Sequence, residues 1–219
     1  MEHFEITKTD EGFHIEGYPE AVKVLGIKGP EARRLADCTL HKCDLEFSLS
    51  CLDGINLVPE EPYALREGLC RSAVIHFAKC FGSSKSRFSL DPKTVYRGDE
   101  GALEPFEYFR SLRNKHLVHD ENSYAQALPG AILNKPDAPH KIEKIVCLSF
   151  ISLTLGQEAY NNLHLLVTRA LEWVAREADV LCDRLTTKFE AQSYDDLSKQ
   201  DGITYTKPSA SAVHKTRTP

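Results

Sequence analysis

The chain has 219 residues, which is enough for one domain whose hydrophobic core needs neither disulfides nor a metal. Its composition, 42% hydrophobic and 27% charged, excludes a fibrous or a disordered protein. The formal net charge of −5 excludes a surface coated with basic residues for non-specific nucleic-acid binding, so any contact with RNA must come from a local patch.

Three features of the sequence lead us to expect a cytoplasmic protein with no membrane contact. No stretch approaches the roughly 20 apolar residues that a bilayer span needs. The acidic residues Glu2, Glu5 and Asp10 lie where an export signal would be basic and then apolar. The seven cysteines are odd in number and lie mainly within helical patterns, which favours reduced thiols over a disulfide scaffold.

A hairpin and two helices are predicted first along the chain. Weak alternation of apolar residues predicts a β-hairpin over residues 3–18. Pro30 at a first-turn position and Gly54 just past the end predict a helix over residues 30–52. A second helix is predicted after Pro62, over residues 63–81, because apolar residues recur there at every fourth position: Leu65, Leu69, Ala73, Phe77 and Phe81.

Residues 82–98, called the basic loop below, are predicted to connect the second helix to a third over residues 102–119. The basic loop has a formal charge of 4 − 1 = +3, from Lys85, Arg87, Lys93 and Arg97 against Asp91. A break rich in Pro and Gly then predicts a two-stranded insertion, and a last helix is predicted over residues 157–189.

These elements predict a mostly α, α+β fold, an antiparallel bundle of about four long helices with a small β-hairpin insertion. We expect an N-terminal extension that forms a β-hairpin over residues 1–27 and a helical domain over 28–191. The insertion is expected at about 125–151, and residues 192–219, which are polar, are expected to form a flexible tail.

Arg113 is an unusual residue in the third predicted helix. It lies in the apolar arc with Phe106, Phe109 and Leu117, which follow helical spacing. An arginine cannot lose its proton to escape desolvation, so this position needs a carboxylate, a cluster of carbonyl groups or an open cleft that binds an anion.

Two histidines follow Arg113 in the same predicted helix. His116 and Asp120 lie on about the same stripe as Arg113, whereas His119 lies about 120° away on an ideal helix. The helix must therefore end or loosen near His119 if His119 and Arg113 are to converge.

Residues 113–120, with the sequence RNKHLVHD, resemble the RNA-cleaving motif of the HEPN superfamily. In that motif an Arg and a polar residue are followed, after four to six residues, by a His on one helix of a helical bundle, and Arg113, Asn114 and His119 match it. With the preceding sequence FEYF at 106–109 and the following hairpin insertion, the segment looks most like HEPN-like families linked to bacterial abortive infection.

The resemblance implies a metal-independent endoribonuclease, a toxin or effector in a bacterial defence system, that needs no cofactor. It implies RNA as a partner, a homodimer in which two motifs meet across a cleft, and a neutralising or regulatory protein partner. It leaves open a HEPN-like module that only binds a nucleotide, RNA or a protein.

Metal-independent cleavage needs a base at the ribose 2′-hydroxyl, an acid at the leaving 5′-oxygen and a cation for the developing phosphorane charge. His119 suits proton transfer because imidazole titrates near neutrality, Arg113 offers permanent charge to phosphate, and Asn114 could orient either group. We expect the basic loop to lie at the mouth of the cleft. The secondary catalytic candidates are His116 and Asp120, and the candidate RNA-binding cations are Lys85, Arg87, Lys93, Arg97, Arg110 and Lys115.

Structural roles would also explain these residues. Arg113 could pair with Asp120 or Glu107 across a helix contact, and His119 could bind the last carbonyl groups of its helix. His116 could be a partly buried core histidine, with Asp120 fixing its tautomer.

Two Cys–His pairs could each present two metal ligands on a helix face. Cys38 with His41, and His76 with Cys80, have the i, i+3 and i, i+4 spacings that this requires. No CxxC or HExxH sequence accompanies them, so core packing is favoured and we expect no metal.

Overall fold

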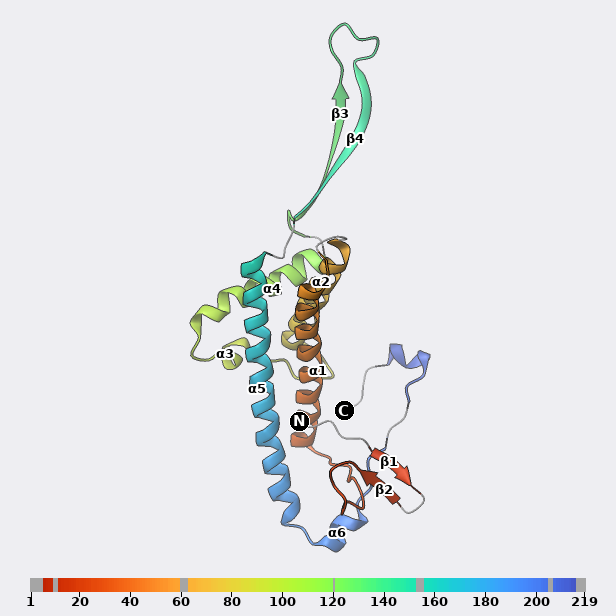
Figure 1. Cartoon of the computed structure of the whole chain (residues 1–219), viewed down its shortest axis with the longest axis vertical. Helices are drawn as coiled ribbons and strands as arrows, with labels where there is room; N and C mark the ends of the chain where they lie inside the picture. Colours follow the sequence, from red (N-terminus) through yellow and green to blue (C-terminus); the bar gives the residue numbers. More distant parts are fainter. Residues whose placement is uncertain are drawn as a thin grey trace. The chain divides into compact units, whose positions relative to one another are not determined.

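The computed structural model describes residues 6–9, 12–59, 63–119, 121–152, 156–204 and 207–215, which are mostly helical (Figure 1). The chain divides into two compact units, each assembled from separate stretches of sequence. The first unit comprises Met1–Cys43, Gly82–Leu90 and Leu171–Pro219, and the second comprises Asp44–Phe81 and Asp91–Ala170. Two long helices, α1 (Pro30–Leu57) and α5 (Gln157–Glu190), contribute residues to both units.

In the first unit, the beginning of α1 and the end of α5 are joined by an ion pair. Arg34 Nε donates to Glu177 Oε1 at 2.7 Å, and its guanidinium lies 4.4 Å from the centre of the Phe88 ring. The Arg34 guanidinium therefore binds the Glu177 carboxylate through its edge and lies over the Phe88 ring with its face, as guanidinium groups often do.

The first unit also contains the N-terminal hairpin and the C-terminal segment. Strands β1 (Ile6–Thr9) and β2 (Gly12–Ile15) pair antiparallel, as the alternation predicts. The expected flexible tail contains a short helix, α6 (Tyr194–Lys199), whose first turn is capped by the Ser193 side chain. Beyond α6, Gly202 forms an isolated antiparallel bridge with Leu25, which gives this polar segment a backbone partner that the sequence pattern does not reveal.

In the second unit, α1 lies antiparallel to α2 (Tyr63–Phe81). The buried Ser48 hydroxyl donates to the Ala73 carbonyl at 2.9 Å, while Asp44 Oδ1 lies 2.8 Å from His76 Nδ1. In these contacts, residue numbers rise along α1 as they fall along α2, so the two helices run in opposite directions. These polar contacts hold the two helices at one register.

Helices α1 and α5 are also antiparallel within the second unit. The Asn56 amide donates to the Tyr160 hydroxyl at 2.8 Å, and Asp53 Oδ1 lies 3.6 Å from His164 Nε2. On the inner side of α5, Leu163 and Val167 are completely buried. The helical spacing of the apolar residues therefore predicts this buried stripe correctly.

Aromatic rings fix α4 (Leu103–Leu112) in the second unit. The Phe106 ring lies 4.8 Å from Phe81 and 6.1 Å from Phe77 of α2, centre to centre. It also lies 6.0 Å from the Tyr96 ring, and the Tyr96 hydroxyl donates to the Leu166 carbonyl of α5 at 3.1 Å. The first half of α4 is therefore packed on an apolar, aromatic support.

The insertion between α4 and α5 is a two-stranded antiparallel ribbon. Strand β3 (Ala125–Leu133) and strand β4 (Ile142–Ile151) lie side by side in Figure 1 along their length, with Leu128 opposite Leu148. Both strands lie within the range expected for the insertion, about 125–151. No residue of either strand is buried.

Two local predictions were wrong. Helix α1 continues through Gly54 to Leu57 instead of ending before it. A Cβ atom at Gly54 would lie 3.5 Å from the Leu69 side chain of α2, so this glycine is part of a contact between helices and not of a helix stop. The basic loop contains the short helix α3 (Pro92–Val95), because the Asp91 carboxylate accepts from the Lys93 and Thr94 backbone N–H groups.

Candidate functional site

The segment Arg113–His119, called the motif segment below, begins where α4 ends. Helix α4 buries Phe106, Phe109 and Leu112, and residues Arg113–Val118 continue it as a π-helix. A π-helix closes hydrogen bonds at i→i+5, is rare, and frequently occurs at functional sites. The helix therefore loosens directly after Leu112. The sequence predicts that it ends or loosens later, near His119.

Arg113 is half-buried and its charge has no carboxylate partner within the described residues. Its Nη1 atom donates to Asn114 Oδ1 at 2.8 Å, which is a neutral acceptor on an exposed neighbour. Glu107, one of the two carboxylates considered as a structural partner, pairs instead with Arg110 at 2.6 Å. The other, Asp120, lies outside the described residues, so its secondary catalytic role and its pairing with Arg113 or His116 stay predictions.

His116 is directed into the protein and is only 9% exposed. Its ring lies 5.5 Å from the Tyr124 ring in an edge-to-face arrangement. Both ring nitrogens are buried and have no hydrogen-bond partner among the described residues. In this placement His116 packs as a core residue, because a nucleotide outside the protein could not reach either nitrogen.

Tyr108 and Tyr124 form an aromatic support beneath the motif segment. Partial burial raises the pKa of Tyr108 to about 12, and the charge of Tyr124 and its hydrogen bond to Tyr108 add to this rise. Since Tyr124 also packs against His116, the start of the β3–β4 insertion and the motif segment share one cluster. The sequence gives Tyr108 a helical position on α4, but no periodicity links Tyr124 to it.

His119 ends the π-helix and is exposed, as are Asn114 and Lys115. Within the described residues, no hydrogen bond or ion pair joins His119 to Arg113. The motif segment therefore presents an arginine, an amide, a lysine and an imidazole, which can bind an anion and exchange a proton. Within one chain, no described hydrogen bond connects the imidazole and the guanidinium.

The basic loop is divided between the two units. Lys85 and Arg87 belong to the first unit, whereas Lys93 and Arg97 belong to the second, as does the motif segment. Arg110 is exposed but compensated by Glu107. The expected position of the basic loop at the mouth of a cleft stays a prediction.

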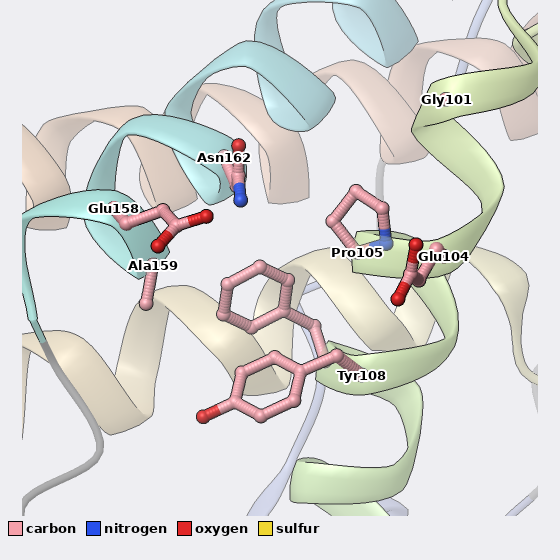
Figure 2. Close-up of a pocket in the computed structure, with 8 residues that line it drawn as sticks. Gly101, Glu104, Pro105, Tyr108, Glu158, Ala159 and Asn162 are labelled. Atoms are coloured by element: carbon pink, nitrogen blue, oxygen red, sulfur yellow. The ribbon is translucent and has the colours of Figure 1, made fainter.

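A cavity of about 500 Å³ lies in the second unit between α4 and the start of α5. Figure 2 shows Glu158, Asn162, Glu104 and Tyr108 around it, with both carboxylates and the amide at its border. No residue of the motif segment lines this cavity. Its two carboxylates would repel a phosphate group, so we do not assign RNA binding to it.

The Cys–His pairs considered as metal sites have other contacts. His41 is completely buried and its Nε2 lies 2.9 Å from the Phe88 carbonyl oxygen, while His76 contacts Asp44. Among the described residues, no group of three or more His, Cys, Asp or Glu side chains could hold a metal ion. In that same part of the chain no helix has the length and apolar content to cross a membrane.

No protein-family model matches the chain, and neither a curated protein nor a solved structure matches it at a significant level. A function can therefore be proposed only from the residues of the motif segment and from what they resemble.

Proposed function

We propose that the chain is a metal-independent endoribonuclease of HEPN type that acts through Arg113 and His119. The observation that carries this proposal is the available charge of Arg113, which is half-buried at the start of the π-helix beside a neutral amide. A guanidinium in such a position gains from an anion, because its only described side-chain partner leaves the charge uncompensated. RNA supplies a phosphate anion at every nucleotide.

In the proposed reaction the ribose 2′-oxygen attacks the adjacent phosphorus, and the bond from phosphorus to the 5′-oxygen breaks. A base takes the proton of the 2′-hydroxyl, and an acid gives a proton to the leaving 5′-oxygen. Arg113 stabilises the negative charge that develops on the phosphorane oxygens. The products are a 2′,3′-cyclic phosphate and a 5′-hydroxyl.

His119 is the proton-transfer residue in this proposal, since it is exposed whereas the nitrogens of His116 are buried. One imidazole cannot take one proton and give another at the same moment on opposite sides of the phosphorus. A homodimer would supply two imidazoles, one as base and one as acid, which is why we propose that two motif segments act together.

The test is cleavage of single-stranded RNA by the full chain in the presence of EDTA. We expect His119→Ala to lower the rate by about 10²-fold or more, and Arg113→Ala to lower it similarly. Matched controls are His214→Ala, an exposed histidine in the first unit, and Arg66→Ala, an arginine of α2. Products that end in a 2′,3′-cyclic phosphate would support attack by the neighbouring hydroxyl.

A second candidate function is RNA binding without cleavage. It is favoured by one observation, the lack of any described hydrogen bond between Arg113 and His119 within the chain. Binding that depends on Arg113, without cleavage under any condition, would select this alternative. Equal cleavage by wild type and His119→Ala would reject the proposed mechanism.

The resemblance further supports a toxin role. Expression of the wild-type chain in bacterial cells should then stop growth, whereas expression of His119→Ala to the same level should not.

A further inference from the structure

The β3–β4 ribbon exposes large apolar side chains on both of its faces. Leu128, Leu148 and Phe150 share one face and are 49%, 55% and 54% exposed. On the other face, Ile145 and Ile151 are each 69% exposed. An isolated two-stranded hairpin is marginally stable at best in water and needs a further strand or a packed surface. Within the part of the chain that the structure describes, the ribbon therefore lacks a partner that its apolar sequence requires.

The body of the ribbon is free of charge. Residues 125–134 and 145–151 contain no Asp, Glu, Lys, Arg or His. Its acidic, basic and histidine side chains all lie near the turn: Lys135, Asp137, His140, Lys141, Glu143 and Lys144. An acidic or basic partner would find no complementary charge on this body. A second copy of the chain would meet no like charge there, although each chain carries a net charge of −5.

The alternation of hydrogen-bonded and non-hydrogen-bonded residue pairs between β3 and β4 shows which backbone groups are directed outward. The Ser152 N–H donates to the Tyr124 carbonyl at 2.7 Å, so 124 and 152 form a hydrogen-bonded pair. Such pairs alternate along an antiparallel ladder, so the pairs with outward N–H and C=O groups include Ala127 with Ser149 and Pro129 with Cys147. The outward residues of β4 are Ile145, Cys147, Ser149 and Ile151.

The two outer edges of the ribbon differ. On β3, Pro129 occupies an outward position, where its missing N–H costs no bond within the ribbon but interrupts the outer edge. On β4, residues 145–151 contain no proline, no charge and no register shift. Charges, prolines and bulges are the features that protect edge strands from pairing. The edge of β4 is therefore the one open to another strand.

We propose that β4 pairs antiparallel with β4 of a second copy of this chain, about a two-fold axis at Leu148. In this register Ile145 lies opposite the partner's Ile151, and Cys147 opposite the partner's Ser149. All four outward residues of each β4 then exchange both backbone hydrogen bonds with the opposite strand. The two ribbons become one four-stranded sheet.

The side chains of this pairing are self-complementary. Leu148 lies opposite the partner's Leu148, and Val146 lies opposite the partner's Phe150, on the face that already carries Leu128. Every opposed pair is apolar or small, and Glu143 and Lys144 lie beyond the paired segment. Such isologous pairing closes at two copies. This inference does not depend on the proposed RNA chemistry.

The first test compares two proline substitutions in the full chain. Ser149→Pro removes an outward donor of β4, whereas Ala127→Pro removes an outward donor of β3 directly across the ribbon. Both spare the hydrogen bonds between β3 and β4, so their local costs match. Sedimentation equilibrium should show a dimer for wild type and Ala127→Pro, and for Ser149→Pro a dissociation constant raised by tenfold or more.

A second pair of variants keeps the proposal testable if the proline variants do not fold. Leu148→Lys places two like charges at the two-fold axis, whereas Leu128→Lys places the same charge on the same face one strand away. We expect Leu148→Lys to dissociate the dimer far more than Leu128→Lys. The register is checked with Leu148→Cys in a Cys147→Ser background, because opposed residues of a non-hydrogen-bonded pair lie within disulfide range. We expect a disulfide-linked dimer from this variant but not from Leu128→Cys.

Three results would overturn the proposal. The first is a wild-type monomer at all concentrations up to about 100 μM, a range in which a specific dimer of Kd near 1 μM would form. The second is equal weakening by both members of each matched pair. The third is a monomer that binds lipid vesicles and loses this binding equally in Leu148→Lys and Leu128→Lys, which would assign the ribbon to a lipid surface.

Discussion

The Asp44 carboxylate of α1 lies 2.8 Å from His76 Nδ1 of α2, and the same oxygen accepts from Lys79 at 2.9 Å. The carboxylate side chain is only 9% exposed, whereas both of its partners reach solvent. Among the described contacts, this carboxylate of α1 therefore binds two side chains of α2 at once.

We expect Asp44→Ala to lower the free energy of unfolding by about 1–3 kcal/mol, because a nearly buried charged acceptor is lost. Chemical denaturation followed by circular dichroism measures this change. Glu107→Ala is the control, since it breaks the exposed Glu107–Arg110 pair within α4, which is worth about 0.2–1 kcal/mol. Equal losses in the two variants would contradict a bridging role for Asp44.

His116→Phe tests whether His116 is a core residue. Both imidazole nitrogens are buried without described partners, so an apolar ring of similar shape should preserve the contact with Tyr124 and remove an unsatisfied polar group. We expect stability within about 1 kcal/mol of wild type or above it, with RNA cleavage retained. Loss of cleavage in a folded His116→Phe variant would transfer the catalytic assignment from His119 to His116.

Much of the helical structure is predictable because it follows from periodic burial. Residues 157–189 carry apolar side chains at helical spacing, and α5 extends from Gln157 to Glu190. The end of α1 is not predictable in the same way, because Gly54 packs against Leu69 in a tertiary contact that has no local sequence signal. The insertion is predictable from its Pro, Gly and β-branched residues. The exposure of its two strands is not predictable, since apolar strands are usually covered by other parts of a protein.

The motif segment is predictable in position but not in geometry. The apolar arc identifies Arg113 as a residue that needs an anion or a partner, and within the described residues it has no carboxylate partner. The buried ring of His116 packs against Tyr124, which lies directly before β3. No helical periodicity could include that contact.

Tyr108 makes the fold sensitive to alkaline pH. Its pKa is raised from about 10 to about 12 in the folded chain, so the unfolded chain releases its proton first as pH rises. Its contribution to stability is therefore complete below pH 10 and is lost as pH rises through about 12. Thermal unfolding between these values should depend less on pH in Tyr108→Phe than in wild type. An unchanged pH dependence would contradict this protonation linkage.

The last prediction concerns the charge of Arg113. Asn114→Asp keeps the side-chain shape and the acceptor oxygen, which lies 2.8 Å from Arg113 Nη1, but replaces a neutral partner by a carboxylate. We expect the stability to rise by a few tenths to about 1 kcal/mol, as for other ion pairs near a surface. RNA cleavage should fall by tenfold or more, because the carboxylate occupies the guanidinium and repels phosphate.

Asn161→Asp provides the matched control for this change. It adds the same charge to an exposed position on α5, where the Asn161 side chain contacts Gln157 and not the motif segment. If both variants cleave RNA equally, or if Asn114→Asp binds RNA as tightly as wild type at several salt concentrations, Arg113 does not act through its free charge. A selective loss in Asn114→Asp, with the fold intact by circular dichroism, would separate the anion-binding role of Arg113 from any role in stability, because only the former requires an uncompensated guanidinium.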